Sequence, residues 1–260
     1  MYRIAITFAI AFTLSLSALA ADYGHLHITA TDQQAAAEWY ARNFDGTAEG
    51  FGGATGEGVK IDRAVISGIP IVIFKKDAGF PGSVGSGVDH IGFSMPNIAE
   101  KAKSLVADGA KMLGEPRNFG GMDLAFVEDP WGTKIEIIDD PDTRGLHHIH
   151  VHSADANATL DWYEAAFGGE RAKFKGALPA LKYGQVWLIV QGSKKELAPT
   201  KGRAMDHLGW NFPDLDAAAK ELKAKGVKFT LEPRPYRNIK IAFIEGPDGV
   251  SIELVEPPKN

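Results

Sequence analysis

Apolar and polar residues follow a pattern that repeats four times along the chain. Each repeat opens with a short apolar strand that carries a histidine, as in HLHITA from His25 and HIHVHS from His148. A segment with apolar residues at helical spacing comes next, for example Ile98, Ala102 and Leu105. Three further apolar runs, separated by glycines, complete each repeat. The pattern predicts four βαβββ modules and therefore an α+β protein.

The predicted helices share a polar residue at their start. It lies seven positions after a strand histidine in every repeat, at Asp32, Asn97, Asp155 and Asp214. These side chains can accept hydrogen bonds from the free amides of a first helical turn. Asn97 and Glu100 also form a capping-box pattern, so we expect a helix over 97–107.

The four repeats form two related halves. The segment that opens at His25 matches the segment at His148 with an offset of 123 (148 − 25). The segment 88–117 matches 205–234 with an offset of 117 (205 − 88). We therefore predict a first domain over 21–140, an acidic linker over 141–145 and a second domain over 146–260, each containing two modules.

Residues 1–20 predict a secretory signal peptide. Arg3 precedes an apolar run, and Ala18-Leu19-Ala20 supplies the small residues of a cleavage site. The run is short for a membrane-spanning helix, which leaves an uncleaved anchor as the alternative. We expect cleavage after Ala20, a periplasmic or secreted location, and no membrane contact of the mature chain.

Composition restricts the chemistry and the partners. The chain has 28 Lys and Arg against 33 Asp and Glu, a net charge of −5. A mildly acidic chain without long basic runs argues against nucleic acid or an anionic membrane as partner. The sequence contains no cysteine, which excludes cysteine nucleophiles and thiolate metal ligands.

All eight histidines lie on the predicted opening strands, at His25, His27, His90, His147, His148, His150, His152 and His207. Counting back seven positions from each helix start selects one per module, namely His25, His90, His148 and His207. Strand alternation places His148, His150 and His152 on one face. It places His147 on the opposite face, towards the helix.

Two glutamates lie in the closing apolar strands of the second and fourth modules. Glu136 and Glu253 have apolar neighbours, and a carboxylate there is costly to bury unless it is paired or metal-bound. Val72 and Leu188 align with these positions in the first and third modules. Each half then offers two imidazoles and one carboxylate, a set that suits Fe(II) or Mn(II), while Zn(II) is chemically possible. A hydrogen-bonded core histidine and a solvated strand glutamate are the structural alternative.

The motifs resemble the vicinal oxygen chelate superfamily, which contains glyoxalases, extradiol ring-cleaving dioxygenases, and fosfomycin- and bleomycin-resistance proteins. The resemblance rests on the opening H…D…WY pattern, the EPR turn and the closing DP-x-G-x-x-I-E, and it covers the chain after residue 20. It implies that two modules form a cup around a divalent metal, which gives two cup-shaped half-barrel domains. Carried over residue by residue, it implies one metal site at His25, His90 and Glu136 and another at His148, His207 and Glu253.

Residues beside these ligands are candidates for catalysis. Two positions beyond the ligand histidines, the odd modules carry His27 and His150, while the even modules carry Gly92 and Gly209. His27 and His150 could orient a ligand or act as general acid and base beside a substrate, for which the glycines would leave room. A cup-lining histidine with no catalytic part is the alternative. Tyr236 follows the second EPR turn and could contact an anionic or phenolic substrate.

The resemblance implies a metalloenzyme acting on a small molecule with two adjacent oxygens. Three ligands per site favour an extradiol-type dioxygenase, because a chelating diol and oxygen need open coordination positions. Glyoxalase I members typically add a fourth ligand at the end of the first module, where Val72 and Leu188 stand. A glyoxalase-like lyase or isomerase is therefore the alternative, and a non-catalytic binding protein of the bleomycin-resistance kind is a further one.

Overall fold

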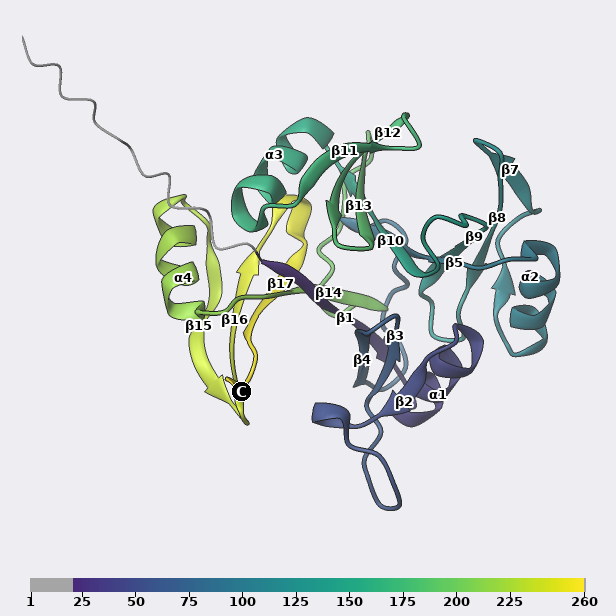
Figure 1. Ribbon diagram of the computed structural model, residues 1–260, viewed down its shortest axis with the longest axis horizontal. Helices are drawn as coiled ribbons and strands as arrows, with labels where there is room; N and C mark the ends of the chain where they lie inside the picture. Colours follow the sequence, from purple (N-terminus) through teal and green to yellow (C-terminus); the bar gives the residue numbers. More distant parts are fainter. Residues whose placement is uncertain (1–20, 260) are drawn as a thin grey trace, which may run out of the picture.

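The computed structural model describes residues 21–259, so the predicted signal peptide lies outside the described residues. The chain forms the predicted α+β protein of four modules, in which helices pack on two mixed sheets (Figure 1). No helix in the described part of the chain combines the length and the apolar character needed to cross a membrane.

Each module runs strand, helix and then further strands. The first contains β1 (Asp22–Ala30), α1 (Gln33–Asn43), β2 (Thr47–Glu49), the 3-10 helix η1 (Phe51–Gly53), β3 (Arg63–Ile66) and β4 (Ile69–Lys75). The second contains β5 (Val88–Ser94), α2 (Ile98–Ala107), β6 (Lys111–Met112), β7 (Arg117–Phe119), β8 (Met122–Glu128) and β9 (Lys134–Ile138). The third contains β10 (Gly145–Ser153), α3 (Ala156–Phe167), β11 (Glu170–Phe174), β12 (Leu178–Tyr183) and β13 (Val186–Gly192). The fourth contains β14 (Met205–Asn211), α4 (Leu215–Ala224), β15 (Phe229–Tyr236), β16 (Ile239–Glu245), the 3-10 helix η2 (Pro247–Gly249) and β17 (Ser251–Glu256).

Three of the four predicted helix caps are formed. The side chains of Asp32, Asp155 and Asp214 accept hydrogen bonds from amides of the first helical turn. Asn97 makes no such bond, and the predicted capping box is therefore wrong. Its backbone is left-handed, with φ 60° and ψ 50°, whereas an N-cap side chain reaches the amides from an extended backbone.

The two sheets each combine modules from both halves of the sequence. The first sheet has the order β15-β16-β17-β14-β1-β4-β3-β2, which joins the first and fourth modules. The second has the order β11-β12-β13-β10-β5-β9-β8-β6 and joins the second and third modules. The opening strands meet in antiparallel pairs, β1 with β14 and β5 with β10. The expectation that the two modules of one half share a cup is therefore wrong.

Consecutive modules instead meet in the core between the sheets. Phe44, directly after α1, stacks on Phe93 of β5 with ring centroids 3.9 Å apart. Phe167 at the end of α3 stacks on Trp210 of β14 at 4.3 Å. These rings belong to one buried cluster that extends through all four modules. Helix packing thus joins the two modules within each half, while the sheets join one half to the other.

Candidate metal centres

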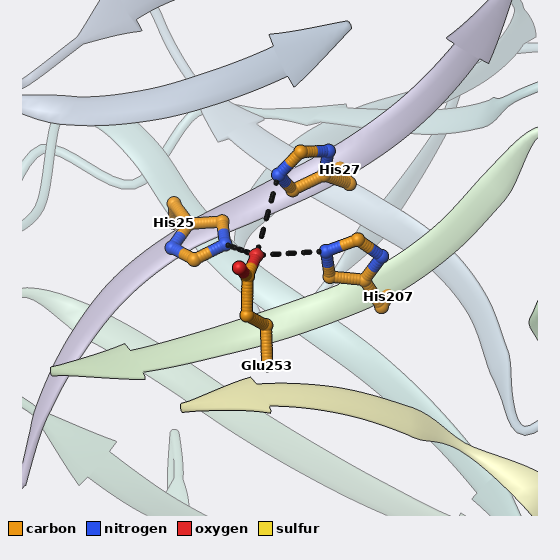
Figure 2. Close-up of side chains that lie close together, drawn as sticks. All are labelled: His25, His27, His207 and Glu253. Carbon is orange, nitrogen blue, oxygen red and sulfur yellow. Dashed lines mark hydrogen bonds and ion pairs between the residues drawn. The ribbon is translucent and has the colours of Figure 1, made fainter. Parts of the chain in front are cut away.

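Four side chains converge on the inner face of the first sheet, which we call the first cluster. His25 and His27 come from β1, His207 from β14 and Glu253 from β17, and all four are buried (Figure 2). The three histidine Nε2 atoms lie 3.0, 3.6 and 3.2 Å from Oε2 of Glu253, in the order His25, His27 and His207. One potential ligand atom from each residue lies within 4.8 Å of the others.

Strand register produces this convergence. His27 on β1 is paired with His207 on β14, and β14 in turn runs parallel to β17 with Gly209 beside Glu253. Alternate residues of a strand share a face, so His25 and His27 both point to the side of Glu253. The first cluster therefore forms where two opening strands and one closing strand lie side by side.

The glycines opposite the ligand histidines make room for imidazole rings. His25 is paired with Gly209, and a Cβ atom on that glycine would lie 2.1 Å from Cε1 of His25. The same relation holds between Gly92 and His148, also at 2.1 Å. The prediction that these glycines leave room for substrate is wrong, because the histidine rings fill the space.

The second sheet carries an equivalent second cluster of His90, Glu136, His148 and His150. Nε2 of His90 and Nε2 of His148 lie 3.1 and 3.5 Å from Oε2 of Glu136. The ring of His150 lies 4.5 Å from that of His90, and its Nε2 donates to Gln191 across 3.1 Å. Both clusters thus contain three imidazoles and one carboxylate.

The six predicted ligands all lie in these clusters, but their partition differs from the prediction. His25 lies with His207 and Glu253, whereas His90 lies with Glu136 and His148. The predicted sets His25/His90/Glu136 and His148/His207/Glu253 are therefore wrong, because each sheet takes its strands from both halves. The role of each residue as a ligand stays a prediction.

The fourth donor position also needs a correction. In the second and fourth modules the carboxylate lies beside the glycine two residues after the ligand histidine. By the same register, His27 lies beside Val72 and His150 beside Ile189. Val72 therefore lies at the position equivalent to the carboxylate, as predicted, whereas in the third module Ile189 and not Leu188 lies there. Val72 and Ile189 offer no ligand atom, but the adjacent His27 and His150 each offer an imidazole nitrogen.

The residues present fit a divalent metal. His148 is 1% exposed, and its Nε2 has no hydrogen-bond partner among the described residues although it points towards Glu136. A buried polar atom without a partner is costly, and a cation between imidazole nitrogen and carboxylate would satisfy it. Imidazole suits Zn, Fe, Ni and Cu, and carboxylate suits Mn, so three imidazoles and one carboxylate do not select one ion.

Protonation favours ligand behaviour in both clusters. Burial alone would raise the pKa of Glu253, but hydrogen bonds from His207 and His25 lower it to about 2. Glu136 follows the same direction, because the adjacent His148 and His90 hold its pKa well below the usual value against the effect of burial. At neutral pH both carboxylates are ionised.

Burial shifts the pKa of His27 and His150 in the direction that favours the neutral form. It lowers the pKa of His27 and of His150 well below the ordinary value, and neighbouring histidines lower it further. Both rings are therefore neutral at neutral pH. A neutral imidazole has the free lone pair that metal binding requires.

Carboxylates behind the ligands orient two of the histidines. His207 donates from Nδ1 to Asp206 at 2.6 Å, and His90 donates from Nδ1 to Asp89 at 2.7 Å. Such a bond fixes the tautomer that presents Nε2 to a metal. Sequence reasoning missed both aspartates, although the repeated pairs VDHIG and MDHLG contain the signal.

His148 has a different support. A bulge in β10 follows Leu146, and His147 shares a hydrogen bond of 2.7 Å between the Nδ1 atoms of the two histidines. Nε2 of His147 lies 3.3 Å from Asp140. The expectation that His147 faces the helix is wrong, because the bulge turns its ring towards His148. Gly24 stands at the equivalent position beside His25.

Tyr236 belongs to neither cluster and lies at the end of β15. Its side chain is 44% exposed, and its ring lies 6.5 Å from that of Phe51 in η1. It therefore belongs to the edge of the first sheet, and its catalytic role stays a prediction. His152 lies near the second cluster, with Nδ1 3.8 Å from Oδ2 of Asp89.

Known proteins share this sequence pattern and fold. Residues 22–137 and 145–254 each match the Glyoxalase/Bleomycin resistance protein/Dioxygenase superfamily. A probable lactoylglutathione lyase of Arabidopsis thaliana, named as chloroplastic, is 28% identical over 64% of this chain, which spans about half (52%) of that relative. A probable lactoylglutathione lyase of Vibrio cholerae is 29% identical over 42% of this chain and 88% of its own length.

The fold comparison extends over nearly the whole chain. The crystal structure of glyoxalase I from Zea mays superposes with a TM-score of 0.71 at 20% identity, covering 91% of this chain and 92% of that one. At this identity the likeness shows the fold alone. Together with the sequence matches over both halves, it completes the assignment: the chain belongs to the Glyoxalase/Bleomycin resistance protein/Dioxygenase superfamily.

Proposed function

We propose that the protein is a metal-dependent lyase or isomerase of the glyoxalase type, acting on a small molecule with two adjacent oxygens. The observation that carries the proposal is the presence of four converging donors in each cluster. The curated relatives named lactoylglutathione lyase support the same class.

The fourth donor removes the argument that favoured a dioxygenase. That argument rested on three ligands per site, with Val72 and Leu188 unable to coordinate. His27 and His150 supply a further nitrogen at each cluster, from the strand beside the missing carboxylate. A cluster with one imidazole in place of a carboxylate keeps four ligands and carries one more positive charge when metal is bound.

The chain's own groups can bind and move a proton at the site. A bound divalent metal would act as a Lewis acid that polarises a substrate carbonyl. Glu253 is ionised, and its Oε2 is the one anionic acceptor in the first cluster. His27 is neutral and adjacent, so its Nε2 is a second acceptor. Glu136 and His150 are the corresponding groups of the second cluster.

An extradiol-type dioxygenase is the second candidate function. The observation in its favour is that His25, His207 and Glu253 alone form a two-histidine, one-carboxylate set within the first cluster. If His27 does not coordinate, positions for a diol and oxygen remain open.

Oxygen consumption separates the two candidates. Protein loaded with Fe(II), Mn(II), Ni(II) or Zn(II) should be assayed with hemithioacetals and other α-hydroxycarbonyl compounds in D₂O, using NMR to follow exchange or transfer of the carbon-bound proton. The proposal predicts metal-dependent proton transfer without oxygen uptake. Oxygen uptake with catechols and no proton transfer on any carbonyl substrate would support the dioxygenase instead.

A further inference from the structure

The inner faces of the two sheets differ at one equivalent position. On the first sheet His27 lies beside Val72, and Val72 is paired with Arg63 of β3. On the second sheet His150 lies beside Ile189, which is paired with Ala180. Two strands away from His27, the first sheet therefore carries an arginine. Two strands away from His150, the second sheet carries an alanine.

Arg63 is half-buried, and only one of its side-chain donors is bonded within residues 21–259. Its side chain is 13% exposed, and its Nε donates to Oδ1 of Asp62 across 2.7 Å. An arginine has five N–H donors, and the remaining ones make no hydrogen bond among the described residues. The register from His27 through Val72 to Arg63 places Arg63 on the face of the first sheet that carries the first cluster.

Further positive charge gathers beside Arg63. The guanidinium carbons of Arg63 and Arg237 lie 5.1 and 4.4 Å from the centroid of the Phe51 ring. Arg237 comes from the turn between β15 and β16, so the fourth module contributes it, while Phe51 belongs to the first. Two arginines around one aromatic ring hold a positive potential where the two modules of the first sheet meet.

The second sheet fills the same region with apolar side chains. They form a separate buried cluster of Met122, Leu124, Ile138, Phe174, Ala180 and Ile189. Ile189 is 1% exposed, whereas its counterpart Val72 is only half-buried. The second and third modules therefore pack against each other where the first sheet presents Arg63.

We propose that the first cluster is the substrate site and that Arg63 binds an anionic group, a carboxylate above all, of a substrate whose two adjacent oxygens face the cluster. The inference rests on the proposed function. Guanidinium matches carboxylate geometry, and a charge-assisted hydrogen bond in a buried setting is strong. The second cluster has Ala180 at the position of Arg63 and lacks this partner.

A pair of hydroxamates tests the assignment by binding alone. Both chelate metal through two adjacent oxygens, but succinohydroxamate carries a terminal carboxylate that acetohydroxamate lacks. Co(II)-loaded full-length protein, with its metal content measured, should be titrated with each while visible absorption and heat are followed. We expect succinohydroxamate to bind about tenfold more tightly or better. Arg63→Gln should remove this preference while leaving acetohydroxamate binding unchanged.

Matched variants control for fold and for site. The double variant Asp62→Asn/Arg63→Gln leaves no unpaired buried charge and should also lose the preference. Lys182→Gln, on the equivalent strand pair of the second sheet, removes one positive charge elsewhere and should keep it. His90→Ala should retain the preference, whereas His25→Ala/His207→Ala, which removes two of the four donors of the first cluster, should abolish it.

The outcomes distinguish this inference from the proposed function. Equal binding of both hydroxamates, or a preference that survives loss of Arg63, overturns the role of Arg63 and leaves the vicinal-oxygen site intact. Binding of neither hydroxamate to fully metal-loaded protein overturns both proposals.

Discussion

A Cβ atom on Gly209 would lie 2.1 Å from Cε1 of His25, so the ring of this histidine occupies the space of the missing side chain. Gly209→Ala should displace His25 and weaken metal binding at the first cluster, on the order of tenfold or more. Gly192→Ala is the matched control, because a Cβ there meets nothing within 4 Å. Competition with a chromogenic chelator measures the affinity, and equal affinity in both variants would refute the role of Gly209.

His27 should be a metal ligand rather than a bystander. His27→Ala removes one of four donors, so we expect the first metal to bind more weakly, on the order of 10–100-fold, but still to bind. His27→Phe should behave in the same way, because the neighbouring Phe74 and His207 rings already pack against this position. Co(II) absorption would report the change in ligand field, and an unchanged spectrum and affinity would show that His27 does not coordinate.

Asp129 should give the protein a distinctive pH dependence. Burial raises its pKa to about 6, although it accepts hydrogen bonds from Tyr40 and from two backbone amides. Because the folded pKa lies above the unfolded value, its favourable contribution is complete below pH 4 and is lost as the pH rises through 6. The difference corresponds to about 3 kcal/mol. Urea unfolding of metal-free protein should show the native chain losing stability relative to Asp129→Asn between pH 4 and 7; parallel curves would contradict this.

Export is a separate proposal. The charge of Arg3, the apolar run and the Ala18-Leu19-Ala20 pattern predict a mature chain that begins at Ala21. Intact-mass analysis of protein from its native host measures this directly. Protein that keeps Met1 in a cytoplasmic fraction would contradict it.

Sequence reasoning predicted the modules better than their assembly. Helix starts such as Asp155 and strand histidines such as His207 follow from local periodicity, which the sequence displays. Duplication shows that modules are equivalent, but it does not show which strand edges meet. The pairing of β1 with β14 depends on three-dimensional packing, so the partition of the ligands could not be deduced.

The exact alignment of the closing strands was a second feature that sequence reasoning could not predict. Alignment of Gly184 with Gly132 gives Leu188 as the counterpart of Glu136, whereas the register beside His150 gives Ile189. A shift of one residue in a strand exchanges its two faces, so this small error moved the assignment from the inner face to the helix side. Arg63 was missed for a related reason, because its position beside the first cluster is apparent only across two strand pairings.

Metal content of two double variants tests the central claim most directly. If His25 and His207 share the first cluster, His25→Ala/His207→Ala should lose one metal and keep the second, giving one per chain. His25→Ala/His90→Ala should damage both clusters and keep none under conditions that load two into the native protein. Elemental analysis of the reconstituted, desalted proteins supplies the numbers. The reverse result, one metal retained by His25→Ala/His90→Ala and none by His25→Ala/His207→Ala, would contradict the arrangement of the sites across the two halves.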